Sequence, residues 1–403
     1  MVAHVDEIRA WLDAHSDEMA ALVIRLVAEE TENPPGRGLG RCAQVLHEAM
    51  DRLGLSPELI EVPPSGALEE PCIIRGTVGC GDKLVYFHGH FDVVPVQDRT
   101  QFHGKRRDGR IIGRGTADMK GGIVSMIYGA AAAKELGLLG DGRIAIHLVC
   151  DEETGSVAGS GYLREHGLID PGAIAMVTAE PSSGSVWNAA RGAVSLRISL
   201  RGKEAHVGQA NLGVNAFQQM LHVARPLEQY AQEMMQRHTR YNMDPNDPRG
   251  SMVVVGGMSG SGSNFNVVPG VAWFSVDSRF NPEEDIDVEL RRMTQIIYDA
   301  ADAIDADVTI ETTQFQPPAA TDETHQAAQL LAASIAEVDG EPARFEMCAG
   351  VLDVRWYAQL GIPAFGYGAG RLDVSHGPSE YIDEAAMRNC AAVYALYANR
   401  LLA

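Results

Sequence analysis

The stretch Leu84-Val-Tyr-Phe-His-Gly-His-Phe-Asp92 decides the fold, because an apolar run ends there in side chains that bind metals. Leu84–Phe87 is typical of a buried strand, and His90 and Asp92 follow at the point where that strand gives way to a turn. Taken alone, a His-x-Asp pair at a strand end is more often structural than functional. A functional interpretation of this pair therefore requires similar residues at the ends of other strands.

Two later apolar runs end in the same way. Arg143–Val149 leads into the pair Glu152 and Glu153, and Ala173–Val177 precedes Glu180. In open α/β sheets, ligands bind outside the carboxyl ends of the strands. The three strand ends are therefore predicted to face one crevice.

Two further segments supply the residue types that complete such a site. Asp118 stands in Gly113-Arg-Gly-Thr-Ala-Asp-Met-Lys-Gly121, and His376 stands in Ser375-His-Gly-Pro-Ser-Glu380. Imidazoles combined with carboxylates select zinc, cobalt or manganese. A pair of such ions sharing one carboxylate could hold a water and polarise a carbonyl, so the segments together indicate a two-metal hydrolytic site.

Six motifs, taken in order, resemble the M20 metallopeptidase family, which includes acetylornithine deacetylase, succinyl-diaminopimelate desuccinylase, aminoacylase and the glutamate carboxypeptidases. They are Gly89–Pro95, Gly113–Gly121, Asp151–Gly155, Ala179–Pro181, Asn266–Pro269 and His376.

The resemblance implies that the ligands hold two divalent ions, with zinc as the expected metal and cobalt or manganese as alternatives. His90, Asp118 and Glu180 would hold one ion. Asp118, Glu153 and His376 would hold the other, so that Asp118 bridges the two.

The resemblance also implies roles for residues beside the ligands. Glu152 would be the general base, and Asp92 would orient a ligating imidazole, as a metal-bound histidine generally requires. The peptide bond between Asp118 and Met119 is expected to be cis. For Glu152 the alternative is a solvated acidic turn, which would be preferred without the other segments.

Substrate contacts are implied for residues of the last half of the chain. His206 would reach toward the scissile carbonyl, in several members of the family from the partner subunit, and could help to stabilise an oxyanion. Asn266, Arg279 and Arg355 would contact the substrate. For Arg279, an ion pair with Asp277 is the alternative.

Composition agrees with an enzyme and excludes other classes. The 403 residues suggest two domains, and the net charge of −21 argues against nucleic-acid or anionic-membrane partners. No apolar run approaches the ~20 residues of a membrane span. The six cysteines lack Cys-x-x-Cys spacing, and the first residues show an amphipathic helical pattern without the apolar h-region of a signal peptide, so a cytoplasmic protein with reduced thiols is expected. His88 and Cys150 are expected to be ordinary core residues.

Two segments could be mistaken for nucleotide-binding loops. Gly256–Ser263 lacks the Lys-Ser/Thr ending of a phosphate-binding loop, and a flexible hairpin or lid edge is expected there. In Gly113–Gly121, Asp118 stands where a dinucleotide fingerprint needs its third glycine. A nicotinamide-binding protein is therefore not indicated.

The order of elements predicts an insertion into an α/β domain. The first part combines short strands with the predicted helices Val5–Glu30, Cys42–Leu53 and Gly121–Leu136. The next part has the β-α-β-β-α-β order of a ferredoxin-like domain. Its predicted elements are Val194–Arg201, Asn215–Arg237, Met252–Gly256, Val271–Asp277, Glu283–Ala303 and Asp307–Thr312. The last part, with Thr321–Val338, a strand near Pro363–Tyr367 and a helix Glu384–Leu401, returns to the first domain.

The predicted architecture is therefore α/β, with a three-layer catalytic domain containing a mixed sheet and an inserted ferredoxin-like α+β domain. Residues 1–189 and 314–403 form the metal-binding catalytic domain. Residues 190–313 form a lid and dimerisation domain, through which a homodimer is expected.

Departures from the family pattern bear on the substrate. Val351 and Leu352 stand where many relatives have small or hydroxyl-bearing residues, which favours a bulkier or more apolar acyl group. Arg191 is single, whereas desuccinylase-like members tend to carry two arginines. A succinyl-diaminopimelate substrate is therefore not favoured.

The predicted function is hydrolysis, by metal-activated water, of the amide bond of an N-acyl amino acid or of a C-terminal peptide-like bond. One alternative is an aminopeptidase or dipeptidase with the same metal chemistry. Another is a binding protein built on an inactive enzyme fold, against which the retention of Glu152 argues.

Overall fold

The computed structural model describes residues 5–66, 68 and 70–403, which form two compact units. The first comprises 1–188, 320–346 and 352–403 within these limits, and the second comprises 189–319 and 347–351. The start of the chain at residues 1–4, where a signal peptide is not expected, lies outside the described residues. Among the helices of the described part, none is long and apolar enough to cross a membrane.

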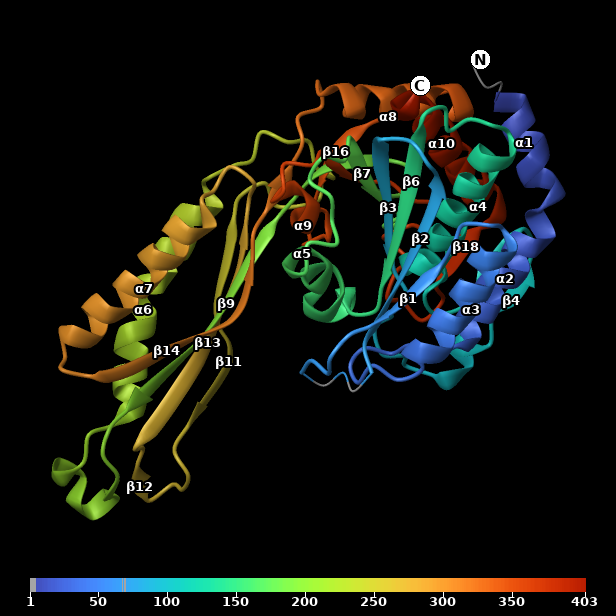
Figure 1. Cartoon of the computed structure of the whole chain (residues 1–403). Helices are drawn as coiled ribbons and strands as arrows, with labels where there is room; N and C mark the ends of the chain where they lie inside the picture. Colours follow the sequence, from blue (N-terminus) through green and yellow to red (C-terminus); the bar gives the residue numbers. More distant parts are fainter. Residues whose placement is uncertain (1–4, 67, 69) are drawn as a thin grey trace. The chain divides into compact units, whose positions relative to one another are not determined.

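The first unit is built on a nine-stranded mixed sheet (Figure 1), of which β8, β15 and β16 each include one or two residues assigned to the second unit. Its main path runs β1-β2-β6-β3-β7-β17-β8-β15, and β16 pairs with β8. The bounds are β1 Glu58–Glu61, β2 Cys72–Gly79, β3 Lys83–His90, β6 Gly142–Val149, β7 Ala175–Thr178, β8 Val186–Ala190, β15 Ala319–Ala320, β16 Phe345–Cys348 and β17 Ala364–Gly366. A small second sheet joins β18 Tyr381–Asp383, β5 Arg110–Ile112 and β4 Lys105–Arg107.

Helices lie on both sides of the central strands, α4 and α10 on one side and α5 and α9 on the other (Figure 1). The helices of this unit are α1 Val5–Ala14, α2 Ser16–Ala28, α3 Leu39–Arg52, α4 Gly121–Glu135, α5 Tyr162–Glu165, α8 Gln326–Asp339, α9 Val354–Ala358 and α10 Glu384–Leu402. The three-layer arrangement explains why β3 is buried along its whole length after Lys83. It also explains α4, which is buried from Gly121 to Ala133 because it packs against α10 and β3.

Three neighbouring strands bring the chemically active turns together. β3 lies between β6 and β7 and is parallel to both. The carboxyl ends of the three strands therefore meet at one edge of the sheet, as the apolar runs predict. The residues that follow them, from His90, Asp151 and Thr178 onward, start at that edge.

The prediction of one helix over Val5–Glu30 is wrong, because the chain forms two helices that meet at His15. His15 Nδ1 lies 2.7 Å from the carbonyl oxygen of Trp11, and its ring stacks on the indole of Trp11. The imidazole thus competes for the carbonyl that the i→i+4 ladder uses. The local backbone turns, and α2 begins at Ser16.

The second unit has the predicted ferredoxin-like order. Its elements are β9 Gly192–Arg201, α6 Ala216–Met235, β11 Met252–Ser261, β13 Val271–Phe280, α7 Ile286–Asp302 and β14 Asp307–Gln316. The sheet order is β11-β13-β9-β14, with every pair antiparallel. A two-stranded sheet of β10 Ala205–His206 and β12 Val267–Val268 completes the unit.

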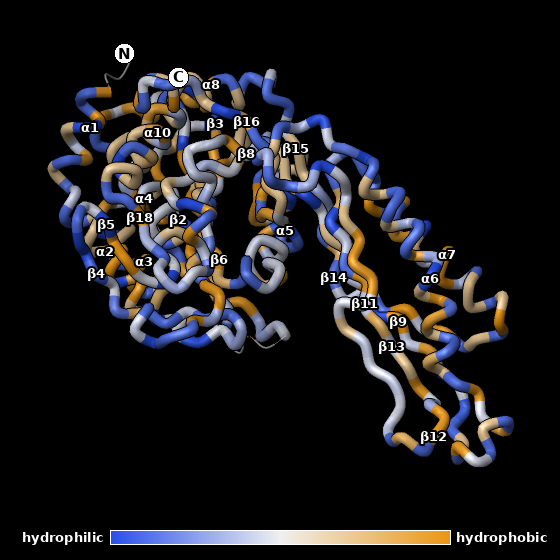
Figure 2. The backbone as a smooth tube through the Cα atoms, turned by 180° about the vertical axis from the view of Figure 1, so that it is seen from behind, coloured by the Kyte–Doolittle hydropathy of each residue, from blue (hydrophilic) through white to orange (hydrophobic). Residues whose placement is uncertain are grey.

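Burial alternates along β9, because α6 and α7 cover one face of this sheet. Figure 2 shows the hydrophobic colouring that runs along β9 and β13. The buried side chains include Val194, Leu196 and Ile198 from the strand and Val223 and Leu227 from α6. This unit therefore has a core of its own.

Two predictions for the second unit are corrected. Most of the Gly/Ser tract is strand and not a flexible hairpin, because β11 continues to Ser261 beyond a register shift between Val255 and Ser259. A bulge allows the strand to continue pairing through glycine-rich sequence. The strand expected at Asp307–Thr312 also continues, to Gln316, after a similar shift.

Candidate metal centre

His90, Asp118 and Glu180 form the first group of possible metal ligands, with ligand atoms within 4.8 Å of one another. His90 is the last residue of β3, and Glu180 follows β7. His90 Nε2 lies 3.2 Å from Asp118 Oδ1 and 3.9 Å from Glu180 Oε1. All three residues are buried.

Asp118, Glu153 and His376 form a second group that meets the same distance limit. His376 Nε2 lies 3.2 Å from Asp118 Oδ2 and 3.3 Å from Glu153 Oε1. The two oxygens of Asp118 thus face different imidazoles, which is the arrangement expected of a bridging carboxylate. The Asp118-Met119 peptide bond is cis, as the family resemblance predicts.

Asp92 connects His90 to the pair Glu152 and Glu153. Its Oδ1 lies 3.3 Å from His90 Nδ1, and its two carboxylate oxygens accept the backbone N–H groups of Glu152 (3.2 Å) and Glu153 (3.1 Å). Asn33 Nδ2 donates to Asp92 Oδ2 at 2.9 Å. One buried carboxylate thereby holds both the imidazole and the turn that carries the predicted base.

Sequence reasoning missed the side chains that fix this geometry from behind. Asn33 precedes the first recognised motif by more than fifty positions, and its local sequence gives no sign of its contact with Asp92. Arg114 and Glu380 lie inside quoted motifs, and they form a buried ion pair of 2.7 Å next to the ligands. The only indication in the sequence is that these two residues have opposite charges and that each stands in a motif with a predicted ligand.

Acidic side chains outnumber the imidazoles in this cluster, and their pKa values reflect this. Burial raises the pKa of Glu180 to about 8, and burial followed by the charge of Glu180 raises the pKa of Glu152 well above its usual value. Contacts with Asp118 and then Glu153 raise the pKa of His376 to about 10. In the metal-free protein, bound protons therefore offset the negative charge of the carboxylates, which a divalent cation could offset instead.

The residues fit divalent ions. Within the described part of the chain, Glu153 Oε1 and Glu180 Oε1 are buried and accept no hydrogen bond, although imidazole nitrogens of His376 and His90 lie 3.3 Å and 3.9 Å from them. Buried carboxylate oxygens without partners are costly unless a cation or proton compensates them. Two imidazoles with three carboxylates are a donor set suited to zinc, cobalt or manganese.

The second unit carries two of the predicted substrate contacts close together. His206 in β10 pairs in register with Val267 of β12, and the N–H of Val207 donates to the carbonyl of Asn266 at 2.9 Å. Both His206 and Asn266 are exposed. His206 Nδ1 accepts the N–H of Gly208 at 3.1 Å, and its Nε2 makes no hydrogen bond with any residue that the structure describes.

The two predicted substrate arginines have partners within the protein. Arg279 pairs with Asp277 at 2.9 Å, which is the alternative that the sequence left open. Arg355 is buried, lies 3.2 Å from Asp353 and donates to the carbonyl of Gly155 at 3.0 Å. A substrate would have to compete with these contacts, so both roles stay predictions.

His88 and Cys150 are core residues, as predicted. His88 is fully buried, with Nε2 at 2.8 Å from Ser160 Oγ, and burial lowers its pKa to about 4. Cys150 is buried, and its sulfur accepts the N–H of Cys72 at 3.4 Å.

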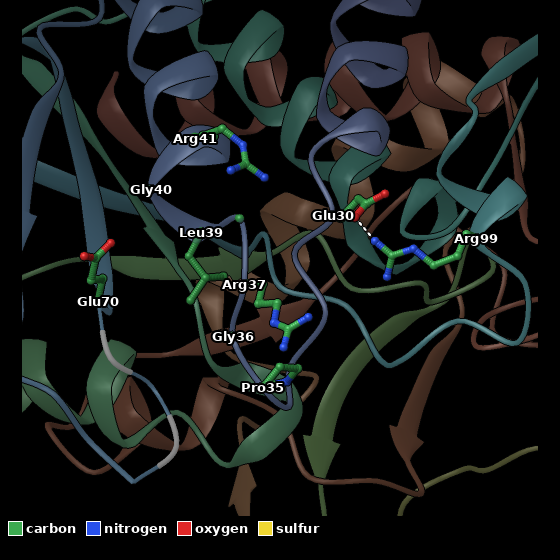
Figure 3. Close-up of a pocket in the computed structure, with 10 residues that line it drawn as sticks. Glu30, Pro35, Gly36, Arg37, Leu39, Gly40, Arg41, Glu70 and Arg99 are labelled. Atoms are coloured by element: carbon green, nitrogen blue, oxygen red, sulfur yellow. Dashed lines mark ion pairs between the residues drawn. The ribbon is translucent and has the colours of Figure 1, made fainter.

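A polar cavity of about 630 Å³ lies elsewhere in the first unit, around the start of α3 (Figure 3). Its lining includes Arg37, Arg41 and Arg99, and none of the candidate ligands. Arg99 pairs with Glu30, and Arg41 pairs with Glu29. Because acidic side chains already pair with two of these three guanidinium groups, the cavity does not indicate an anion-binding site.

Comparisons with known proteins bear on the chain as a whole. The sequence profile of peptidase family M20/M25/M40 matches residues 86–400. The N-formyl-4-amino-5-aminomethyl-2-methylpyrimidine deformylase of Halalkalibacterium halodurans is 22% identical, over 94% of this chain and 93% of the relative. A probable succinyl-diaminopimelate desuccinylase of Staphylococcus aureus is 25% identical, over 67% of this chain and 69% of the relative.

Solved structures show the same fold. An M20 family metallo-carboxypeptidase from Sulfolobus solfataricus superimposes with a TM-score of 0.75 at 17% identity, over 96% of this chain and 99% of the other. A di-peptidase from Saccharomyces cerevisiae gives a TM-score of 0.76 at 16% identity, over 100% and 99%.

Proposed function

The chain belongs to peptidase family M20/M25/M40, and we propose that it is a two-metal amidohydrolase that removes the acyl group from N-acyl amino acids or related amines. Membership confirms the resemblance of the motifs and makes the protein a metal-dependent hydrolase of amide or peptide bonds. The observation that carries the proposal is the position of Asp118, whose two oxygens lie 3.2 Å from His90 and from His376.

The ligands would be His90, Asp118 and Glu180 for one ion and Asp118, Glu153 and His376 for the other. Zinc suits this donor set, with cobalt and manganese as alternatives. Bound there, the ions would supply Lewis-acid polarisation of the scissile carbonyl and a water of lowered pKa.

The chain's own residues would move the protons. Glu152 lies in the turn Glu152–Thr154, directly before the ligand Glu153. Because Asp92 accepts the N–H groups of both glutamates, the turn that carries Glu152 is anchored beside the candidate ligands, while Glu152 itself belongs to neither group of ligands. Glu152 would take the proton of the attacking water and return it to the leaving amine nitrogen.

The preference for deacylation rests on the relatives that span the chain. The relative from Halalkalibacterium halodurans, which aligns over 93% of its own length, is named a deformylase, and its substrate name describes an N-formyl amine. Dipeptidase and carboxypeptidase names belong to structures of less than 20% identity, which show only the fold.

A substrate panel tests the proposal. N-formyl, N-acetyl and longer N-acyl amino acids, dipeptides and amino-terminal chromogenic amides would be compared with added zinc, cobalt or manganese. Release of free amine from the N-acyl compounds should exceed cleavage of the dipeptides. Faster cleavage of dipeptides or of amino-terminal amides would instead establish the peptidase alternative.

Metal binding should release protons. At pH 7, Glu180 with a pKa of about 8 and His376 with a pKa of about 10 carry protons in the metal-free protein, and both must lose them to ligate. Affinity for Mn²⁺ should therefore rise with pH through this range. Calorimetric titration in two buffers of different ionisation enthalpy should show fewer protons released per ion at pH 9 than at pH 7. Equal release at both pH values would contradict this assignment of protons.

We further propose a homodimer formed through the second unit. β11 is an edge strand, and beside it α6 and β11 line an apolar groove of about 540 Å³ that includes Phe217 and Leu221. Leu221 and Val254 are both more than half exposed. A second copy related by two-fold symmetry would pair the strand edge and cover these side chains.

Complementation tests whether His206 acts across that dimer. Glu152→Ala and His206→Ala homodimers should each be nearly inactive, but a mixture that is unfolded and refolded should regain activity. Random pairing makes half of the dimers mixed, each with one intact site of two, so recovery should approach about a quarter of wild-type sites. Mixed dimers that form without recovery would place His206 in its own chain's site or outside catalysis.

A further inference from the structure

Arg114 and Glu380 form an ion pair that is not part of either group of candidate ligands. Each side chain is only 1% exposed, and Arg114 Nη1 lies 2.7 Å from Glu380 Oε2. An isolated buried pair contributes little net stability, because the loss of hydration offsets the attraction. The contacts that the pair makes with neighbouring backbone are therefore more informative than its charge.

Glu380 holds the backbone of the bridging aspartate. Its Oε1 accepts the N–H of Ala117 at 2.9 Å and the N–H of Asp118 at 3.1 Å. Asp118 has φ −128° and ψ 95°, within a turn that otherwise leads into α4. The carboxylate of Glu380 thus fixes the peptide groups from which the Asp118 side chain extends.

Arg114 holds the backbone of the distant histidine. Its Nη2 donates to the carbonyl oxygen of His376 at 3.2 Å, while Nη1 bonds to Glu380. His376 has φ 61°, a left-handed conformation that a residue with a side chain adopts at a cost. A planar guanidinium can bond both groups at once, which a lysine ammonium cannot do in the same geometry.

We propose that the Arg114–Glu380 pair is a positioning device that sets the spacing between Asp118 and His376, and so the affinity of the site for the ion that these two residues share. The inference rests on the proposed two-ion site. In this proposal, two residues that are not ligands hold the backbones of two ligands that are 258 positions apart in the chain. Partners of this kind typically change metal affinity about 10–100-fold.

The test compares Glu380→Gln and Arg114→Lys with a matched control, Glu384→Gln. Glu384 is 7% exposed and forms a 2.7 Å ion pair with Arg106 in the same unit. It has no hydrogen bond to the backbone of Asp118 or His376 among the contacts of the described residues. The control therefore removes a comparable charge without touching either ligand.

Two readouts separate positioning from general stability. Competition with a chromogenic chelator measures the two stepwise Zn²⁺ affinities, and the visible absorption of the Co²⁺-loaded protein reports coordination. The metal-free unfolding temperature is measured beside them. We expect Glu380→Gln and Arg114→Lys to weaken one of the two stepwise Zn²⁺ affinities about 10–100-fold, to leave the other near its wild-type value and to alter the Co²⁺ spectrum. Glu384→Gln should lower the unfolding temperature at most, with wild-type Zn²⁺ affinities.

A double variant guards against misfolding. Glu380→Gln leaves a buried guanidinium unpaired, which can be strongly destabilising. Arg114→Gln/Glu380→Gln removes both charges, so this variant should fold and still show one weakened Zn²⁺ affinity. Wild-type Zn²⁺ affinity in the folded double variant would overturn the inference, and so would equal weakening by Glu384→Gln. Wild-type protein that binds fewer than two ions would instead refute the proposed function.

Discussion

Replacing Glu152 with glutamine should leave two divalent ions bound and lower turnover by about 10²–10⁴-fold. Glutamine has the size of glutamate, but its amide cannot accept the proton of an attacking water. The backbone N–H of Glu152 remains available to Asp92, so the turn should keep its position. Metal content by atomic spectroscopy and steady-state kinetics on the best N-acyl substrate provide the two measurements.

Glu153→Gln is the matched comparison, because the two glutamates are adjacent and both donate their N–H to Asp92. Only Glu153 faces His376, at 3.3 Å. This substitution should therefore weaken binding of one ion as well as turnover. Equal loss of metal in the two variants, or an active Glu152→Gln enzyme, would show that the roles of base and ligand are misassigned.

The placement of the ligands could be predicted because strand ends are local features. The apolar runs before His90, Glu152 and Glu180 are adjacent parallel strands. Recognising the end of each run in the sequence was therefore enough to predict that these three residues lie at the same edge of the sheet. His376 is different, since its segment follows no long strand. Only the resemblance to a family connected it with Asp118.

What the sequence could not predict depends on contacts between distant segments. The break at His15 arises from a single side chain that competes for the Trp11 carbonyl. Asn33 contacts Asp92 across 59 positions. Hydrophobic periodicity contains no information about such hydrogen bonds, because a polar residue in a loop has the same pattern whether or not it reaches a functional carboxylate.

The sequence pattern also predicts strands that are shorter than the observed ones. Gly256–Ser261 reads as a flexible tract, yet it remains paired with β13 after a register shift. Intrinsic preference for a loop is outweighed when the neighbouring strand offers hydrogen bonds to the backbone. The longer β11 provides the unpaired edge on which the proposed dimer depends.

Asp118→Ala should have the largest effect of all, because it removes the residue that both groups of ligands share. Each group would fall from three candidate ligands to two, and two ligands do not make a closed site for zinc. Metal content should fall from two ions toward none, and the loss of turnover should exceed that of Glu152→Gln, since the base has no activated water to serve without metal.

Asp141→Ala is the control, because Asp141 is an exposed aspartate of the same unit that lies before β6 and outside both groups. It should keep two ions and full turnover. The unfolding temperature of Asp118→Ala, measured without metal and with excess Zn²⁺, separates loss of the site from loss of the fold. A folded site lacking its bridge gains little from the ion, whereas wild-type protein gains stability by mass action. An Asp118→Ala enzyme that kept its metals and its turnover would show that the shared carboxylate does not hold them, and the two-ion assignment would then be wrong.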